Sequence, residues 1–195
     1  MKDVRICFIG DSFVNGTGDE NALGWAGILC AEANKKGASV TYYNLGIRRN
    51  TSHDILQRIN SEVSIRLPPS LDCRVVLSFG VNDTVIEEGK VRVSEQDSIS
   101  NFEKIVNLVK ENYKVIVVGP PPINNDEHNS RISSLNNGLR KKAKELSISF
   151  IELYSHLVRD EEYKKEITEN DGAHPRGGGY EKLAKIIGSS EVWWF

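Results

Sequence analysis

Five short runs of apolar, largely β-branched residues recur along the chain, with helical patterns of apolar residues between them. The runs cover residues 4–9, 40–45, 74–79, 114–119 and 148–153. Alternation of strands and helices is typical of a parallel sheet covered by helices on both faces. The first, third and fourth runs are nearly continuous in apolar residues, which predicts that they are the central strands. The sequence therefore predicts an α/β fold, a three-layer α/β/α sandwich around a five-stranded parallel sheet.

Apolar residues between these runs follow the three- and four-residue spacing of amphipathic helices. This pattern predicts helices around residues 55–63, 99–109, 132–146 and 180–187, and a less regular pattern predicts one over about 24–36. Thr51 and Ser52 are candidate N-caps for the helix at 55–63. No internal repeat, low-complexity tract or flexible linker divides the chain. We therefore expect one domain spanning residues 1–195.

The charges argue against nucleic acid and membranes as partners. The chain has 25 Lys and Arg and 27 Asp and Glu, a net charge of −2, and no basic stripe. No apolar run approaches the roughly 20 residues of a transmembrane helix. Charges at positions 2, 3 and 5 interrupt any signal-peptide stretch, which predicts a cytoplasmic protein. The three cysteines are expected to be reduced and buried, without a metal site or disulfide: Cys7, Cys30 and Cys73.

The segments that follow the predicted strands carry the candidate chemistry. In open parallel sheets, ligands bind beyond the carboxyl ends of the strands. The segments at this edge are residues 10–12, 46–48, 80–83 and 120–122, and three of the four begin with glycine. Ser12 lies in the first of them. An isolated Asp-Ser pair at this position is usually a helix cap, so a nucleophilic serine needs a base, an orienting group and oxyanion donors elsewhere in the chain.

The segment from Asp171 to Pro175 offers the base. A three-residue spacing in a turn allows the Asp171 carboxylate to reach one ring nitrogen of His174, leaving the other nitrogen for Ser12. Taken alone, the same spacing more often reflects a capped turn with a loop histidine. The other histidines have weaker claims. His53 falls in the first turn of a predicted helix, His128 in a polar loop, and His156, after the fifth strand, is the fallback base.

Three groups are candidates for the oxyanion hole, which needs donors arranged around one point. They are the backbone N–H groups of Ser12 and Gly46 and the side-chain amide of Asn82. Asn82 alone would also suit a simple turn.

Four blocks together resemble the signature of the SGNH hydrolases, the GDSL-like lipases and esterases, in order and spacing. The blocks are Gly10-Asp11-Ser12, Asn44-Leu45-Gly46, Gly80-Val81-Asn82-Asp83 and Asp171-Gly172-Ala173-His174-Pro175. The resemblance implies the flavodoxin-like fold of that family. It also implies Ser12 as nucleophile, His174 as base, Asp171 as its orienting partner, and Ser12, Gly46 and Asn82 as the oxyanion hole. No metal or organic cofactor is implied.

The same resemblance implies hydrolysis through an acyl-enzyme on Ser12. The substrate can be an ester, a thioester or an acetylated sugar, and water or an alcohol can be the acceptor. A compact domain without a lid favours small or short acyl groups. The chain departs from the commoner pattern at Phe13, where the family name places leucine, and after Gly46, where arginines replace small residues and a further glycine.

Several residues near the blocks are candidates for contact with the substrate. Arg48 and Arg49 could favour an anionic substrate, although exposed arginines are more often solvated or ion-paired. Asp11 and Asp83 adjoin the predicted catalytic residues and are further candidates. The proline-stiffened loop 119–125 is expected to form a fixed wall. The aromatic end, residues 192–195, is expected to pack against the body or a second subunit, so a homo-oligomer stays open.

Two other functions are compatible with the same fold. One is a catalytically silent module that binds a small ligand, against which the complete triad argues. The other is a nucleotide- or flavin-binding protein. The glycines at 16 and 18 are followed by Asp19 and Glu20, and no third glycine completes the pattern, so acidic groups would repel a phosphate there.

Overall fold

The computed structural model describes residues 3–195 and contains the predicted five-stranded parallel sheet. The strand order is β2-β1-β3-β6-β7, which confirms the expected central strands β1, β3 and β6. All four neighbouring pairs are parallel. The strands are β1 (Asp3–Gly10), β2 (Ser39–Gly46), β3 (Asp72–Ser78), β6 (Lys114–Val118) and β7 (Ser149–Ile151).

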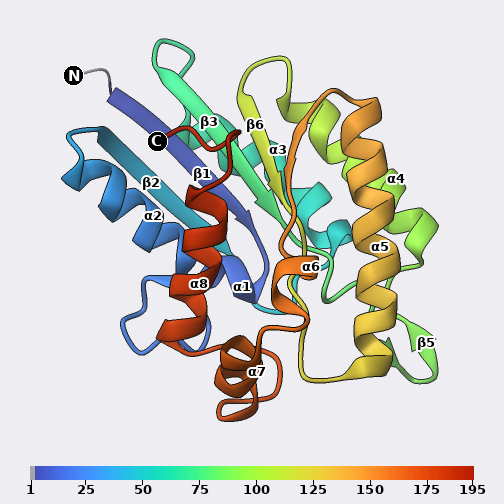
Figure 1. Cartoon of the computed structure of the whole chain (residues 1–195). Coiled ribbons are helices and arrows are strands. Elements are labelled where there is room, and N and C mark those ends of the chain that lie inside the picture. Colours follow the sequence, from blue (N-terminus) through green and yellow to red (C-terminus); the bar gives the residue numbers. More distant parts are fainter. Residues whose placement is uncertain (1–2) are drawn as a thin grey trace.

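Helices cover both faces of the sheet, as the three-layer prediction requires. Alternate residues of β1 enter two separate cores, Ile6 and Phe8 on one face and Cys7 and Ile9 on the other. Helices α2 (Gly24–Lys35) and α8 (Gly177–Gly188) pack on the first face, and they lie side by side in Figure 1. The second face is covered by α3 (Ser52–Arg66), α4 (Glu95–Val109) and α5 (Asp126–Glu145).

The carboxyl ends of three adjacent strands meet in register. Gly10 at the end of β1 lies opposite Gly46 of β2 and Ser78 of β3. A Cβ atom added to Gly10 would lie 1.9 Å from the carbonyl oxygen of Ser78, so only glycine fits there. The loops that leave β1, β2 and β3 therefore begin at one level and side by side.

Several short elements were not predicted. They are α1 (Ser12–Asn15), the hairpin of β4 (Ile86–Glu87) and β5 (Lys90–Val91), α6 (Tyr154–Leu157) and α7 (Glu161–Thr168). Four of these five elements are helices or strands of two to four residues, too short for a hydrophobic period to appear. Helix α7 buries only Tyr163 and Ile167.

The aromatic end of the chain packs against the body, as expected. Trp193 is 8% exposed and joins the core that contains Phe8, with ring centroids 6.5 Å apart. The guanidinium of Arg74 lies 5.0 Å from the ring centroid of Trp194 and 5.1 Å from that of Phe195. Arg74 lies near the start of β3, so these aromatics cover the amino ends of the strands and not the edge that carries the motif loops.

The three cysteines are free, and all three are buried, as expected. Burial raises the pKa of both Cys7 and Cys30 to about 12, so neither thiol ionises near neutral pH. Within residues 3–195, no helix combines the length and the apolar character needed to cross a membrane.

Candidate active site

Ser12 is the first residue of α1, the single helical turn that follows β1. The Asp11 carboxylate caps this turn by accepting a hydrogen bond from the Phe13 N–H at 3.0 Å. Gly16 ends the turn in the left-handed region, with φ of 84°. Ser12 is 5% exposed. The end of β1, the Asp11 cap and the helical turn together hold its hydroxyl at the carboxyl edge of the sheet.

His174 and Asp171 meet Ser12 in one continuous chain of hydrogen bonds. His174 Nε2 lies 2.7 Å from Ser12 Oγ, and His174 Nδ1 lies 2.7 Å from Asp171 Oδ2. An ionised carboxylate only accepts hydrogen bonds, so Nδ1 carries the proton and Nε2 is the acceptor for the Ser12 hydroxyl. The structure thus brings together all three residues of the predicted triad.

Asp171 also fixes the backbone of the turn that carries the histidine. Its Oδ1 accepts the N–H groups of Ala173 at 3.0 Å and His174 at 2.7 Å. Partial burial alone would raise the pKa of Asp171, but these hydrogen bonds and the one from the imidazole bring the pKa below its ordinary value. The carboxylate stays charged and holds both the ring and the main chain of His174.

The remaining histidines lie elsewhere. His53 Nε2 pairs with Gln57 on α3, and His156 is exposed on α6. The expectation of a polar loop around His128 was wrong, because the residue lies in the first turn of α5 and is 9% exposed. Its Nε2 lies 2.9 Å from Thr84 Oγ1, and burial lowers its pKa, so it supports the turn after β3 as a neutral ring.

The predicted oxyanion donors converge on the same edge, but two of them already have protein acceptors. Gly46 packs so closely on α1 that an added Cβ would lie 2.2 Å from the Asn15 nitrogen, and its own N–H donates to Asn44 Oδ1 at 3.1 Å. The Asn82 amide donates to the Asn50 carbonyl at 3.1 Å and to Asp11 Oδ2 at 3.3 Å. A substrate oxygen would therefore have to replace at least one of these acceptors.

Asp11 and Asp83 are buried, so the prediction that they contact substrate is corrected. Asp83 is fully buried and accepts the Ser52 N–H at 3.0 Å and the Ser98 hydroxyl at 2.7 Å, which ties the turn after β3 to α3 and α4. Asp11 is 1% exposed. Burial, with a smaller contribution from the charge of Asp83, raises the pKa of Asp11 to about 7. Both carboxyls position neighbouring segments.

The two arginines after β2 have different surroundings. Arg49 forms an ion pair with Glu87 of the β4–β5 hairpin, and its carbonyl accepts Arg92 Nη1 at 3.0 Å. It adopts φ of 67°, a left-handed conformation that favours glycine. Arg48 is exposed. Of the two, Arg48 is the one left available to an anionic substrate.

A small apolar cluster adjoins the triad. It consists of buried Phe13, Val81 and Ile132, with partly buried Ile123 and Tyr154 packed against it. The Phe13 ring also lies against His174. Ile123 belongs to the predicted wall loop, and the next residue, Asn124, donates its N–H to the Gly172 carbonyl at 2.9 Å. The wall loop therefore lies beside the turn that carries the base.

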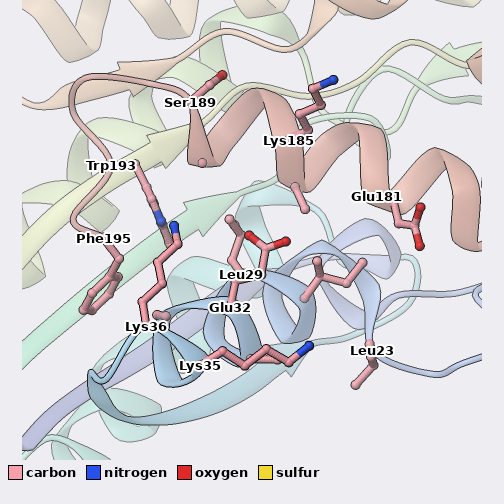
Figure 2. Close-up of a pocket in the computed structure, with 15 residues that line it drawn as sticks. Leu23, Leu29, Glu32, Lys35, Lys36, Glu181, Lys185, Ser189, Trp193 and Phe195 are labelled. Carbon is pink, nitrogen blue, oxygen red and sulfur yellow. The ribbon is translucent and has the colours of Figure 1, made fainter.

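A cavity of about 640 Å³ lies in another place, between α2, α8 and the aromatic end of the chain. Figure 2 shows Glu181 and Leu23 toward one end and Trp193 and Phe195 toward the other. Its lining contains apolar, lysine and glutamate side chains but no histidine or cysteine and none of the three triad residues. This cavity is therefore separate from the Ser12 edge that carries the predicted triad.

Arg58 is a residue at this edge that sequence reasoning missed. It lies on α3 and donates to the main chain where β1 and β2 end. Its spacing of twelve residues from Gly46 gives no local signal, because only the folded sheet brings the two together. Among residues 3–195, no group of three or more His, Cys, Asp or Glu side chains is arranged to hold a metal ion.

Known proteins share the sequence pattern and the fold. Residues 8–182 match the GDSL-like Lipase/Acylhydrolase family. The uncharacterized protein YpmR of Bacillus subtilis (strain 168) is 23% identical over 208 residues, 95% of this chain and 80% of YpmR. The lipase/acylhydrolase from Enterococcus faecalis is 26% identical, with a TM-score of 0.77 over 96% of this chain and 93% of that one.

The fold is also shared with an acetyl xylan esterase, AlAXEase. Its TM-score is 0.78 at 23% identity, over 96% of this chain and all 100% of that one. The family match covers most of the chain and includes the four sequence blocks, and the five-stranded sheet agrees with these neighbours. The chain therefore belongs to the GDSL-like Lipase/Acylhydrolase family and is a hydrolase of ester bonds.

Proposed function

We propose that the protein is a serine esterase that cleaves small or short-chain acyl esters through an acyl-enzyme on Ser12. The observation that carries the proposal is the hydrogen-bonded chain from Asp171 through His174 to Ser12, with both contacts at 2.7 Å. A serine, a histidine of fixed tautomer and a carboxylate in this order are the groups that nucleophilic acyl transfer needs.

The reaction follows from the protonation states of these groups. The Ser12 oxygen attacks the substrate carbonyl while His174 Nε2 takes the hydroxyl proton. The imidazolium then gives this proton to the departing alcohol, and the acyl group stays on Ser12. Water repeats the sequence, with His174 again taking and returning a proton, to release the acid. Asp171 stabilises the imidazolium in both halves.

The negative oxygen of each intermediate needs donors. In our proposal these are the Ser12 N–H, the Gly46 N–H and the Asn82 amide. The contact from Asn82 to Asp11 Oδ2 is long, at 3.3 Å, so a charged oxygen can replace it at small cost. Such donors are commonly worth about 100-fold or more in rate.

The proposed size of the substrate rests on the apolar surface beside the triad. Among the described residues, two partly buried apolar side chains pack against the cluster around Phe13 and Val81, those of Ile123 and Tyr154. A short acyl chain can be covered by so small a surface, whereas a long one would leave much of its length in water.

The first test is covalent labelling by a fluorophosphonate, which reacts with activated serines. Native protein should be labelled and Ser12→Ala should not. Labelling that persists in the variant would assign the reactivity to another residue, and no labelling of either protein would favour a catalytically silent ligand-binding module.

The second test compares substrates. A series of nitrophenyl esters of increasing chain length should show its maximum at acetate or butyrate, and a maximum at long chains would contradict the proposed substrate size. An acetyl thioester and an acetylated sugar separate the three kinds of acyl donor. The cytoplasmic location and the oligomeric state stay predictions, which cell fractionation and sedimentation of the purified protein would test.

A further inference from the structure

We infer that Arg58 is a positioning residue that holds three of the four sequence blocks in their relative places at the catalytic edge. The inference rests on the proposed esterase function. The polar partners of Arg58 are Gly10, Leu45, Asn50 and Glu62 and none of the triad residues, so it acts through the segments that carry the nucleophile and the oxyanion donors.

The guanidinium of Arg58 has three hydrogen bonds to these segments. Nη2 donates to the carbonyl of Gly10 at 3.0 Å and to the carbonyl of Leu45 at 2.9 Å. Nε donates to Asn50 Oδ1 at 2.9 Å. One planar group therefore joins the end of β1, the end of β2 and the loop that follows β2.

Each acceptor belongs to a segment that holds or contacts a predicted catalytic group. Gly10 is two residues before Ser12, and Leu45 immediately precedes Gly46. The Asn50 carbonyl accepts the Asn82 amide at 3.1 Å, so the loop held by Arg58 also orients that amide. The nucleophile block, the glycine block and the asparagine block thus depend on one side chain.

Arg58 is itself held firmly by its helix. Thr51 and Asp54 cap the start of α3 reciprocally, and the Ser52 N–H donates to buried Asp83. The Arg58 side chain is 15% exposed and lies 3.7 Å from Glu62. Its remaining nitrogen, Nη1, is buried without a hydrogen-bond acceptor among the described residues. Burial of the Arg58 charge costs free energy, and its hydrogen bonds to the three blocks offset this cost.

Lysine can fulfil only part of this role. A single ammonium lacks the planar fork that reaches two carbonyls and a side-chain amide in fixed directions. Arg66 provides a matched comparison, because it lies on the same helix and pairs with the same Glu62, but its hydrogen bonds are to that residue alone.

The experiment compares native protein, Arg58→Ala, Arg58→Lys and Arg66→Ala with nitrophenyl acetate. We expect Arg58→Ala to lower kcat by about 100-fold and to change KM by less than about threefold, because misplaced groups act on the transition state more than on binding. Arg58→Lys should lose about 10-fold, and Arg66→Ala less than about twofold. Millimolar guanidinium should restore part of the activity of Arg58→Ala, whereas sodium at equal ionic strength should not.

An NMR measurement tests the same inference without activity. The side-chain amide signal of Asn82 and the backbone amide signal of Gly46 should shift in Arg58→Ala and Arg58→Lys but not in Arg66→Ala. Unchanged signals in the Arg58 variants, or equal losses of kcat in the Arg58 and Arg66 variants, would overturn the role of Arg58. If native protein hydrolyses no ester, the esterase proposal fails, and the amide signals still decide whether Arg58 positions the three blocks. If Arg58→Ala does not fold, Arg58→Lys carries both measurements.

Discussion

The ring of Phe13 lies against the imidazole of His174, with centroids 5.0 Å apart and 41° between the planes. Phe13 is the residue that departs from the leucine in the family name. An aromatic ring stabilises a neighbouring cation by about 0.5 to 2 kcal/mol where its face is turned toward the charge. The departure therefore places an aromatic ring in contact with the proposed base.

Phe13→Leu should lower kcat for a short ester about two- to fivefold, because the imidazolium formed in the transition state loses this contact. Phe102→Leu is the matched control, since Phe102 is equally buried but packs against Phe79 in the other core. Steady-state kinetics of both variants at matched folded fraction measure the effect. Equal changes in the two variants would show that only packing matters.

Asp171→Asn should lower kcat by about 1,000-fold or more while the protein stays folded. The amide would offer a donor or a weaker acceptor to His174 Nδ1, so the ring would lose its fixed tautomer and the stabilisation of its charge. The rate of fluorophosphonate labelling measures this loss independently of substrate binding. A variant labelled as fast as the native protein would remove Asp171 from the proposed mechanism.

Asp11 should make the native protein less stable as the pH rises. Its pKa is about 7 in the folded state against an ordinary value of 3.8, so the folded state holds this proton more tightly than the unfolded chain does. Between about pH 5 and about pH 8, native protein should lose about 2 to 3 kcal/mol relative to Asp11→Asn, whose side chain does not ionise. Urea unfolding at several pH values tests this, and parallel pH profiles for the two proteins would contradict it.

Two substitutions of one residue in the loop after β2 distinguish the effect of backbone strain from that of ion pairing. Arg49 has φ of 67° and pairs with Glu87. Arg49→Gly and Arg49→Ala both lose the ion pair, but only glycine adopts this conformation freely. The glycine variant should therefore be the more stable by about 1 kcal/mol in thermal or urea unfolding. Equal stabilities would indicate that the loop changes conformation in the alanine variant.

The Arg48 side chain should affect the hydrolysis rate of negatively charged esters and not that of neutral ones. Arg48→Ala should reduce kcat/KM for an ester that carries a carboxylate by up to about fivefold and leave a neutral ester unchanged, since an exposed charge contributes about 1 kcal/mol or less. Arg49→Ala, in which an ion-paired side chain is removed, should alter the two esters equally. The effect of Arg48 should also shrink at high salt. An unchanged ratio of the two rates would end the hypothesis of anion selectivity.

The sequence predicted the helices and strands in which burial gives the apolar residues a regular spacing. The central strands β1, β3 and β6 are apolar on both faces, and helices α3, α4, α5 and α8 show a clear apolar stripe, so these elements were predicted. The β4–β5 hairpin is short and exposed, and no pattern reveals it. The apolar period of α5 becomes visible only near Ile132, although the helix starts at Asp126, which is why His128 was placed in a loop.

Some residues of the candidate site could be predicted from the sequence, and others could not. The spacing of the motifs identified the three residues of the triad, Ser12, Asp171 and His174. It could not show that Asp83 turns inward to Ser52 and Ser98, because the direction of a side chain at the end of a strand depends on which helices pack there. Arg58 gave no signal for the same reason, since two of its three acceptors are main-chain carbonyls, which every residue possesses.

Ser12 and His174 are separated by 162 positions. During synthesis the nucleophile leaves the ribosome early, but its base follows only after the five strands and most of the helices have been made. Closing so long a loop costs entropy that local structure does not repay. Hydrolytic activity should therefore appear only when the segment before α8 docks onto the finished sheet, which makes a turnover assay a sensitive reporter of complete folding.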